Sequence, residues 1–358
     1  MNYKEQDIEF DRTKIYEQLH YSPQPPEYNG SLPWIVQQQI AETNGIHYQD
    51  TVGKLKDYPV YNMPVESVEK GFMLDIGCGW GRWLLAGANK GYIPIGVDLR
   101  LEFCQAGLET LRNNNKNGYT IVADLKSLPF KENIFDLIWS YSVIQHTHKD
   151  RMLNCLSKID QLLSINGYTF LEFPNRNGIR NKFVNVSKAD INKDDYNSWN
   201  VRYYTIDEYK NIFEKEFGNF ELQNHSFIGI GVLPEDLKYV SLKNKLLVGI
   251  SLFGSLLTSI IPPLINFSDS IYIKAHKNSN LKVQDYNSNA ESVMKFLDLN
   301  SINPTDNLNV WPLLSCPVSG GDLILNDSKN ALISSKAQLS YPIVSGIPIL
   351  ISSEASSL

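Results

Sequence analysis

Cysteine is scarce in this chain of 358 residues, which has only four, and none of them shows C-x-x-C spacing. This scarcity argues against a disulfide framework and predicts reduced thiols in a cytoplasmic protein. Runs of basic residues are also missing, and the net charge is −6. That balance disfavours a nucleic-acid binder that relies on neutralising phosphates. The first seven residues lack the apolar core of a signal peptide, and the sequence contains no internal repeat.

The stretch from Phe72 to Arg82 organises the chain, whose length suggests two domains or one large domain with additions. An apolar run at 72–76 predicts a buried strand, three glycines alternate after it, and a helix is expected from Arg82 to about Lys90. Glycines in such a turn let a ligand lie directly against the backbone, and the helix N-terminus offers it free N–H groups. The order strand, Gly-rich turn, helix is typical of a nucleotide-binding βαβ unit.

A second predicted strand, 93–98, ends at Asp98, about 20 residues after the glycines, where an acid can bind ribose hydroxyls. A dinucleotide site requires G-x-G-x-x-G with a small third position. Here Gly77, Gly79 and Gly81 alternate, and Arg82 takes the place of the last small residue. The pattern therefore argues against a bound pyrophosphate.

The motif Asp75-Ile76-Gly77-Cys78-Gly79-Trp80-Gly81 resembles the first motif of class I S-adenosyl-L-methionine (SAM)-dependent methyltransferases. Val122–Leu125 resembles the third motif of that family and Phe135–Ser140 its fourth strand, so the likeness covers roughly 70–277. It implies a doubly wound, seven-stranded Rossmann-like α/β sheet with SAM as cofactor. The cofactor-binding residues it implies are Asp75 for the loop and the methionine end, Gly77, Gly79 and Gly81 for backbone approach, Asp98 with Leu99 at the ribose, Asp124 with Leu125 at the adenine, and Ser140.

The alternating strands and helices from 72 to 175 predict a parallel, doubly wound sheet. Its strands are expected at 72–76, 93–98, 119–123, 135–141 and 167–173, with a helix at 149–164, and two further strands at about 219–231 and 270–277. Ligands of such sheets lie outside the carboxyl ends of the strands. This places the glycine loop, Asp98, Asp124, 140–145 and 172–175 around one crevice.

The acceptor side of this crevice lacks the Asn/Asp-Pro-Pro-Tyr motif of many amino-methylating enzymes. His146 is a candidate general base for methylation of a hydroxyl or an acidic carbon, and the alternative is a residue that only shapes the pocket. Gln145, Arg202, Tyr203 and Tyr204 are candidate acceptor-pocket residues, although the last three could equally anchor the 176–204 loop, a predicted lid. Thr205 and Glu208 predict a capping box.

Residues 1–70 precede the predicted methyltransferase domain, 71–277, as an N-terminal lid or extension. A helix is expected at 32–41, with Pro33 in its first turn. Trp34 and Tyr61 are candidate lid residues, with ordinary packing on the sheet as the alternative.

The segment 233–268 is an unusually apolar insertion, and 246–265 approaches transmembrane length. A span is rejected because the strand at 270–277 must return to the same sheet. Two interpretations remain. One is a helix in the plane of a membrane or facing a hydrophobic substrate, with Lys243 and Lys245 near anionic headgroups. The other is a helix buried against the catalytic domain or a second subunit, which would make a homodimer.

Residues 278–308 read as a linker with a short helix at 290–299, followed by a small domain at 309–355. Trp311–Gly321 and Tyr341–Leu350 resemble the two ends of a small zinc-ribbon-like family whose eukaryotic members activate tRNA and protein methyltransferases. Ser319 and Ser334 stand where that family has cysteines, so we predict no metal. The apolar ends of this small domain predict that it docks in cis on a face or sheet edge of the methyltransferase domain.

Together these features predict a cytoplasmic or membrane-associated methyltransferase that acts at oxygen or carbon of a small or lipid-like acceptor. No nucleic-acid partner is expected. The alternatives are a macromolecular (RNA or protein) methyltransferase and a non-catalytic SAM-binding partner of another enzyme.

Overall fold

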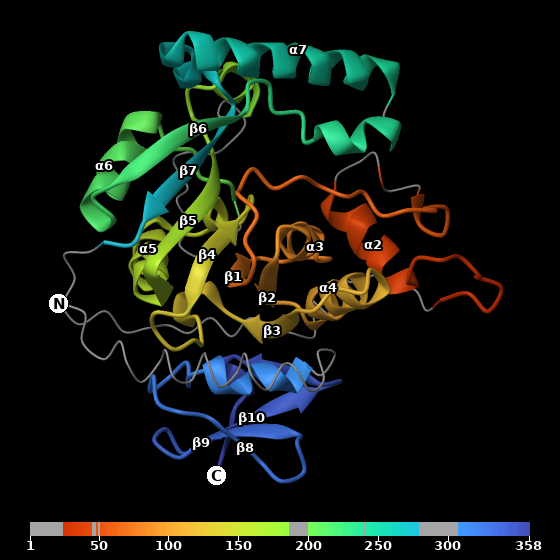
Figure 1. Cartoon of the computed structure of the whole chain (residues 1–358), viewed down its shortest axis with the longest axis vertical. Helices are drawn as coiled ribbons and strands as arrows, with labels where there is room; N and C mark the ends of the chain where they lie inside the picture. Colours follow the sequence, from red (N-terminus) through yellow and green to blue (C-terminus); the bar gives the residue numbers. More distant parts are fainter. Residues whose placement is uncertain (1–23, 45–47, 49–50, 186–199, 240, 279–306) are drawn as a thin grey trace.

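The computed structural model describes residues 24–44, 48, 51–185, 200–239, 241–278 and 307–358 (Figure 1). Its centre is a mostly parallel sheet in the order β6-β7-β5-β4-β1-β2-β3, with β7 antiparallel to both of its neighbours. The strands are β1 Gly71–Ile76, β2 Tyr92–Asp98, β3 Tyr119–Ala123, β4 Phe135–Ser140, β5 Leu163–Pro174, β6 Phe220–Ser226 and β7 Ser270–His276. The predicted α/β fold class is confirmed.

Helices cover both faces of this sheet because side chains of alternating strand positions form two separate hydrophobic clusters. One face packs on the N-terminal region and α3, while the other packs on α5 and α6. The helices are α2 Trp34–Thr43, α3 Arg82–Asn89, α4 Leu101–Asn113, α5 Lys149–Leu162, α6 Ile206–Glu216 and α7 Leu242–Ile260. Short helical turns lie at Leu125–Ser127 (η2), Ile144–His146 (η3), Asn181–Asn185 (η4), Pro234–Tyr239 (η5), Pro262–Phe267 (η6), Asn307–Leu313 (η7) and Ser352–Glu354 (η8).

The C-terminal segment continues the same sheet instead of forming a detached unit. Its strands are β8 Ile324–Leu325, β9 Ala331–Ser334, β10 Leu339–Val344, β11 Ile347–Leu350 and β12 Ser356–Ser357. β11 pairs in parallel with β3, Ile349 with Val122 and Leu350 with Ala123. The Asn307 side chain accepts from the Thr120 N–H (2.8 Å) and donates to the carbonyls of Thr120 (3.0 Å) and Gly346 (2.9 Å). The predicted docking of the C-terminal segment in cis at a sheet edge is confirmed. Because β11 pairs with β3, β3 is not an edge strand.

Several predicted boundaries were wrong. β6 ends at Ser226 instead of about 231, because the Ser226 hydroxyl donates to the Ile228 carbonyl (2.9 Å) and turns the chain out of the sheet. β5 begins at Leu163 instead of 167, and the helix before it ends at Leu162 instead of 164. Pro33 is the N-cap of α2 and does not lie in its first turn. The predicted helix at 290–299 lies outside the described residues.

The apolar insertion consists of η5, α7 and η6, and lies at one end of the molecule beyond β6, opposite the end that holds β8 to β10 (Figure 1). No helix among the described residues is long and apolar enough to cross a membrane. Within α7, however, only Val248, Ser251, Gly254 and Thr258 are buried. The interpretation in which α7 buries its large apolar side chains against the catalytic domain was therefore wrong.

Candidate functional site

The glycine loop that follows β1 turns sharply at left-handed backbone positions. Gly77, Gly79 and Gly81 have φ of 76°, 50° and 89°. A Cβ added to Gly77 would lie 2.3 Å from Cγ2 of Val143, so glycine is required there. A Cβ added to Gly79 would meet no atom within 4 Å. The loop therefore has open space directly against its backbone, as expected where a ligand approaches.

Asp75, on β1 just before the loop, is fully buried, and neither of its carboxylate oxygens has a hydrogen-bond partner among the described residues. Burial raises the pKa of this carboxyl to about 8, although the nearby Arg82 guanidinium lowers it in part. A buried carboxylate without a partner is costly, and a cationic ligand group such as an ammonium removes that cost. Asp75 thus fits the amino-acid end of SAM.

Asp98, at the end of β2, holds the loop in place. Its Oδ2 accepts from the Gly79 N–H (3.1 Å) and its Oδ1 from the Arg100 N–H (3.2 Å). Burial raises the pKa of Asp98 to about 6, while those two backbone hydrogen bonds lower it. Leu99 follows and is half-buried. Asp98 therefore lies beside the glycine loop, where a ribose is expected.

Asp124 and Leu125, after β3, begin the turn η2. The Asp124 carboxylate accepts from the Lys126 N–H (3.0 Å) and lies 3.9 Å from the Lys126 ammonium. Leu125 packs against the main core from a half-buried position. The structure thus gives Asp124 a capping role, and its contact with adenine stays a prediction.

The ends of β4 and β5 carry further buried polar groups. The Ser140 hydroxyl donates to the Ile76 carbonyl (3.2 Å) and the Gln145 amide donates to the Ser142 hydroxyl (2.7 Å). Gln145 Oε1 and Glu172 Oε2 are buried and have no hydrogen-bond partner within the described part of the chain. Burial also raises the pKa of Glu172 to about 7. Buried polar groups normally find partners, so Asp75, Gln145 and Glu172 are candidates to bind a ligand.

His146 lies in η3, and Arg202 is hydrogen-bonded to the backbone of this turn. The Arg202 guanidinium donates to the His146 carbonyl (2.8 Å), and the Arg202 N–H donates to the Gln145 carbonyl (2.9 Å). The Tyr204 carbonyl accepts from the Arg176 N–H (2.8 Å), and burial raises the pKa of Tyr203. These contacts favour the anchoring role for Arg202 and Tyr204, and a role in acceptor binding stays a prediction.

Sequence reasoning missed a cluster of aromatic residues at the ends of β4, β6 and β7. The Arg82 guanidinium lies 4.7 Å from the ring centre of Tyr141, and the Tyr141 hydroxyl is 2.9 Å from His225 Nε2. The rings of His225 and Tyr272 are 4.5 Å apart. Burial, together with Arg82, lowers the pKa of His225 to about 3, so its imidazole is neutral near pH 7. Tyr141 adjoins Ser140 in sequence, but the overlong strand predicted at 219–231 hid the position of His225 at a strand end.

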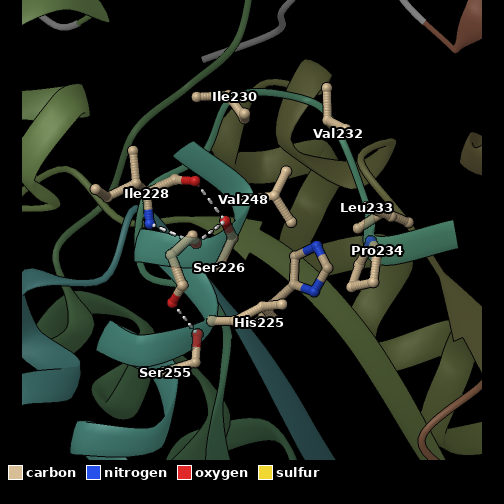
Figure 2. A pocket seen from close by; sticks show the side chains of 11 residues that line it. His225, Ser226, Ile228, Ile230, Val232, Leu233, Pro234, Val248 and Ser255 are labelled. Carbon is tan, nitrogen blue, oxygen red and sulfur yellow. Dashed lines mark hydrogen bonds between the residues drawn. The ribbon is translucent and has the colours of Figure 1, made fainter. Parts of the chain in front are cut away.

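His225 faces a small recess of about 30 Å³ between the loop after β6 and helix α7 (Figure 2). Its ring lies near Leu233, Pro234 and Val248 (Figure 2). The lining is mainly apolar: His225, Ser226, Ile228, Ile230, Val232, Leu233, Pro234, Val248, Ser251, Leu252 and Ser255. The hydrogen bond between Tyr141 and His225 therefore connects this recess to the residue that follows Ser140 in sequence.

The N-terminal region joins the glycine loop to the insertion through a hydrogen-bonded chain. Trp80 Nε1 donates to Asn44 (2.9 Å), the Asn44 amide donates to the Tyr61 hydroxyl (2.7 Å), and Tyr61 donates to Asp236 of η5 (2.6 Å). Tyr61 thus lies between the loop and the insertion, and its role as a lid residue stays a prediction. Trp34 packs edge-on against Tyr28, with the ring centres 5.2 Å apart, in agreement with ordinary packing.

The C-terminal segment has serine hydroxyls at its former ligand positions. Ser319 and Ser334 lie 3.5 Å apart, and Cys316 Sγ is 3.3 Å from the Tyr341 hydroxyl. Within the described ranges no three His, Cys, Asp or Glu residues gather to hold a metal ion. Freedom from metal in the purified protein stays a prediction.

Comparison with known proteins finds similarity in limited parts of the chain. Residues 73–167 match the methyltransferase-domain family. A UPF0434 protein of Pseudomonas aeruginosa (strain LESB58) is 50% identical over 46 residues, which are 13% of this chain and 75% of that protein.

Two solved structures are also similar. One is a complex between the Haloferax volcanii Trm112 methyltransferase activator and the putative methyltransferase (16% identity, TM-score 0.40, covering 60% of this chain and 85% of that one). The other is Haemonchus contortus phosphoethanolamine N-methyltransferase 2 in complex with SAM (19% identity, TM-score 0.41, covering 60% of this chain and 50% of that one).

Proposed function

We propose that this chain methylates oxygen or carbon of a small, lipid-like acceptor. It is a SAM-dependent enzyme by its methyltransferase domain. It is a member of the UPF0434 family by its 46-residue match. The observation that supports the proposal is the hydrogen bond between Tyr141 and His225, because it would connect the proposed cofactor site to this recess. A methyl donor and an apolar acceptor held on either side of this contact lie next to each other.

The cofactor half uses residues that the sequence predicted. We expect Asp75 to pair with the ammonium of the cofactor, Asp98 to accept from its ribose hydroxyls and Asp124 to lie at its adenine. Bound SAM supplies an electrophilic methyl group, so the chain has little acid–base chemistry to perform. Its main contribution is to hold donor and acceptor in line, and such positioning alone accounts for large rate factors.

The acceptor half is mainly apolar, with few polar groups to fix orientation. Within the recess lining, His225, Ser226, Ser251 and Ser255 are the only side chains with polar atoms. This composition suits an amphiphile that presents one hydroxyl or one acidic carbon to the crevice. The neutral imidazole of His225 orients that group by hydrogen bonding, because a pKa of about 3 makes it a weak base. His146 remains the candidate for removing a proton.

Methyl-labelled SAM and a panel of hydroxylated amphiphiles, soluble phenols, RNA and protein test this proposal. We expect label in the amphiphile fraction. His225→Gln should raise KM for the acceptor, His146→Gln should lower kcat, and neither should change SAM affinity. His276→Gln, on β7 and stacked near Tyr168, is the matched control and should behave as wild type. Label found only in RNA or protein would overturn the lipid-like acceptor in favour of a macromolecular one.

A further inference from the structure

We infer that α7 docks the enzyme on an anionic lipid surface, with the helix lying in the plane of the membrane. The exposed side chains of α7 carry this inference. Leu242, Leu246, Phe253, Leu256 and Ile260 are 83%, 66%, 61%, 59% and 67% exposed. At 100° per residue they share one face of the helix, so an unbroken strip of large apolar side chains faces outward.

The opposite face of α7 is small and polar, and tertiary contacts fix it. The Ser251 hydroxyl accepts from the Ile228 N–H (3.0 Å), and the Asn224 amide donates to the Ser255 hydroxyl (2.6 Å). Gly254 packs so closely on Phe227 that a Cβ there would lie 2.2 Å from that ring. The helix cannot rotate to bury its leucines without breaking these contacts. A surface helix with its apolar face outward and its polar face inward requires a covering layer.

The charges around this strip fit an anionic bilayer. Residues 241–268 contain no Asp or Glu, and the exposed Lys243 and Lys245 lie on either side of the apolar strip. Lysines in the first turn are unfavourable for the helix dipole, so they do not serve helix stability. Their long stems let the ammonium groups reach lipid headgroups while the leucines enter the acyl region, and each contributes about 1 kcal/mol near an anionic surface.

A lipid surface fits this face better than a second protein. Protein interfaces are enriched in aromatic residues, Met and Arg and depleted in Lys. The face of α7 is instead built of leucine and isoleucine with one phenylalanine, flanked by lysines. After α7, Pro262 and Pro263 open η6, and exposed Ile261 and Phe267 extend the apolar surface. This composition is typical of an interfacial helix.

Docking in this orientation also places the acceptor recess at the membrane. Val248, Ser251, Leu252 and Ser255 of α7 form one wall of the recess, and Leu252 is 49% exposed. An amphiphile in the outer layer of the bilayer can therefore enter beside Leu252 and reach His225. This route rests on the proposed function, whereas docking itself does not.

Vesicle flotation of the full-length protein tests the docking. We expect flotation with phosphatidylcholine vesicles containing one-third phosphatidylglycerol, and at least tenfold less with phosphatidylcholine alone or in high salt. Leu246→Asp with Phe253→Asp, neither of which lines the recess, should reduce flotation at least tenfold and leave SAM affinity unchanged. Lys243→Glu with Lys245→Glu should remove the preference for anionic vesicles. Ile165→Asp with Ile324→Asp, exposed residues far from α7 in the fold, is the matched control and should float as wild type.

Two outcomes distinguish docking on lipid from a protein interface and from the proposed acceptor. Absence of wild-type flotation, together with a dimer in sedimentation that Leu246→Asp with Phe253→Asp makes monomeric, would overturn the lipid surface in favour of a second copy of the chain. Flotation without methylation of any amphiphile would instead contradict the proposed acceptor and leave the docking intact.

Discussion

Replacing Asp75 with Asn should make the cofactor-free protein more stable while it weakens SAM binding. In the folded chain the buried carboxyl has its pKa raised from 3.8 to about 8, whereas in the unfolded chain it ionises normally. Between about pH 4 and pH 8 the folded state therefore binds more protons than the unfolded state. Stability contributed by this group is present at low pH and is lost as pH rises through that window.

The magnitude follows from the pKa difference. At pH 7 the carboxyl must be kept protonated about three pH units above its unfolded pKa, a cost of about 4 kcal/mol at 1.4 kcal/mol per unit. Asn avoids ionisation but leaves an amide unpaired, which costs about 1–3 kcal/mol. A net gain of about 1–3 kcal/mol remains. SAM loses a charged hydrogen-bond partner worth about 1.5–3 kcal/mol, so its affinity should fall about tenfold to 150-fold.

Thermal unfolding and isothermal titration of SAM at pH 6, 7 and 8 measure both effects. Wild-type affinity should rise about tenfold from pH 6 to pH 7, because ionised Asp75 is the binding form, and Asp75→Asn should lose this rise. Asp136→Asn is the control. Its carboxylate accepts from the Phe72 N–H (2.9 Å) and the Ser164 hydroxyl (2.9 Å), away from the crevice, so it should lose stability but keep SAM affinity. Unchanged SAM affinity in Asp75→Asn would refute the reasoning.

Four further predictions concern the loop and the sheet edge. Asp98→Ala removes the acceptor for the Gly79 N–H and for ribose, and should weaken SAM binding about tenfold or more in the same titration. Gly77→Ala places a Cβ 2.3 Å from Val143 in a left-handed conformation, and should cost about 1–3 kcal/mol in denaturant unfolding; wild-type stability there would contradict the loop geometry. Asn307→Ala leaves the Thr120 N–H without its acceptor and should lower stability by about 1–3 kcal/mol. Removal of 302–358 should lower solubility because it uncovers β3, while chelators should have no effect; stoichiometric zinc in the full-length protein would overturn the metal-free prediction.

The cofactor half of the site was predictable because its signals are local. Alternating glycines after an apolar strand, and an acid ending the next strand, depend on neighbours in sequence. The structure places the Asp98 carboxylate against the Gly79 N–H, and the binding of SAM by these residues stays a prediction. Strand ends were less predictable where side chains redirect the backbone, as Ser226 does by bonding to Ile228.

The acceptor half could not be predicted because it depends on long-range contacts. Tyr141 and His225 are 84 residues apart, and nothing in the sequence around either one indicates their hydrogen bond. The orientation of α7 was hidden for a similar reason. Its apolar length suggested burial, yet serines and a glycine at 251, 254 and 255 fix which face turns inward. The sequence also predicted the docking of the C-terminal segment but not its strand, which pairs in parallel with β3.

The most direct test of the central claim is transfer of labelled methyl from SAM to a lipid extract by the full-length protein. We expect label in the organic phase. We expect this label to decline at least tenfold in the single variant Asp75→Asn, and likewise in the double variant Tyr141→Phe with His225→Gln. The first variant alters the proposed cofactor half, and the second removes the Tyr141–His225 contact itself. A wild-type protein that binds SAM but leaves the organic phase unlabelled, while it labels RNA or protein, would contradict the account.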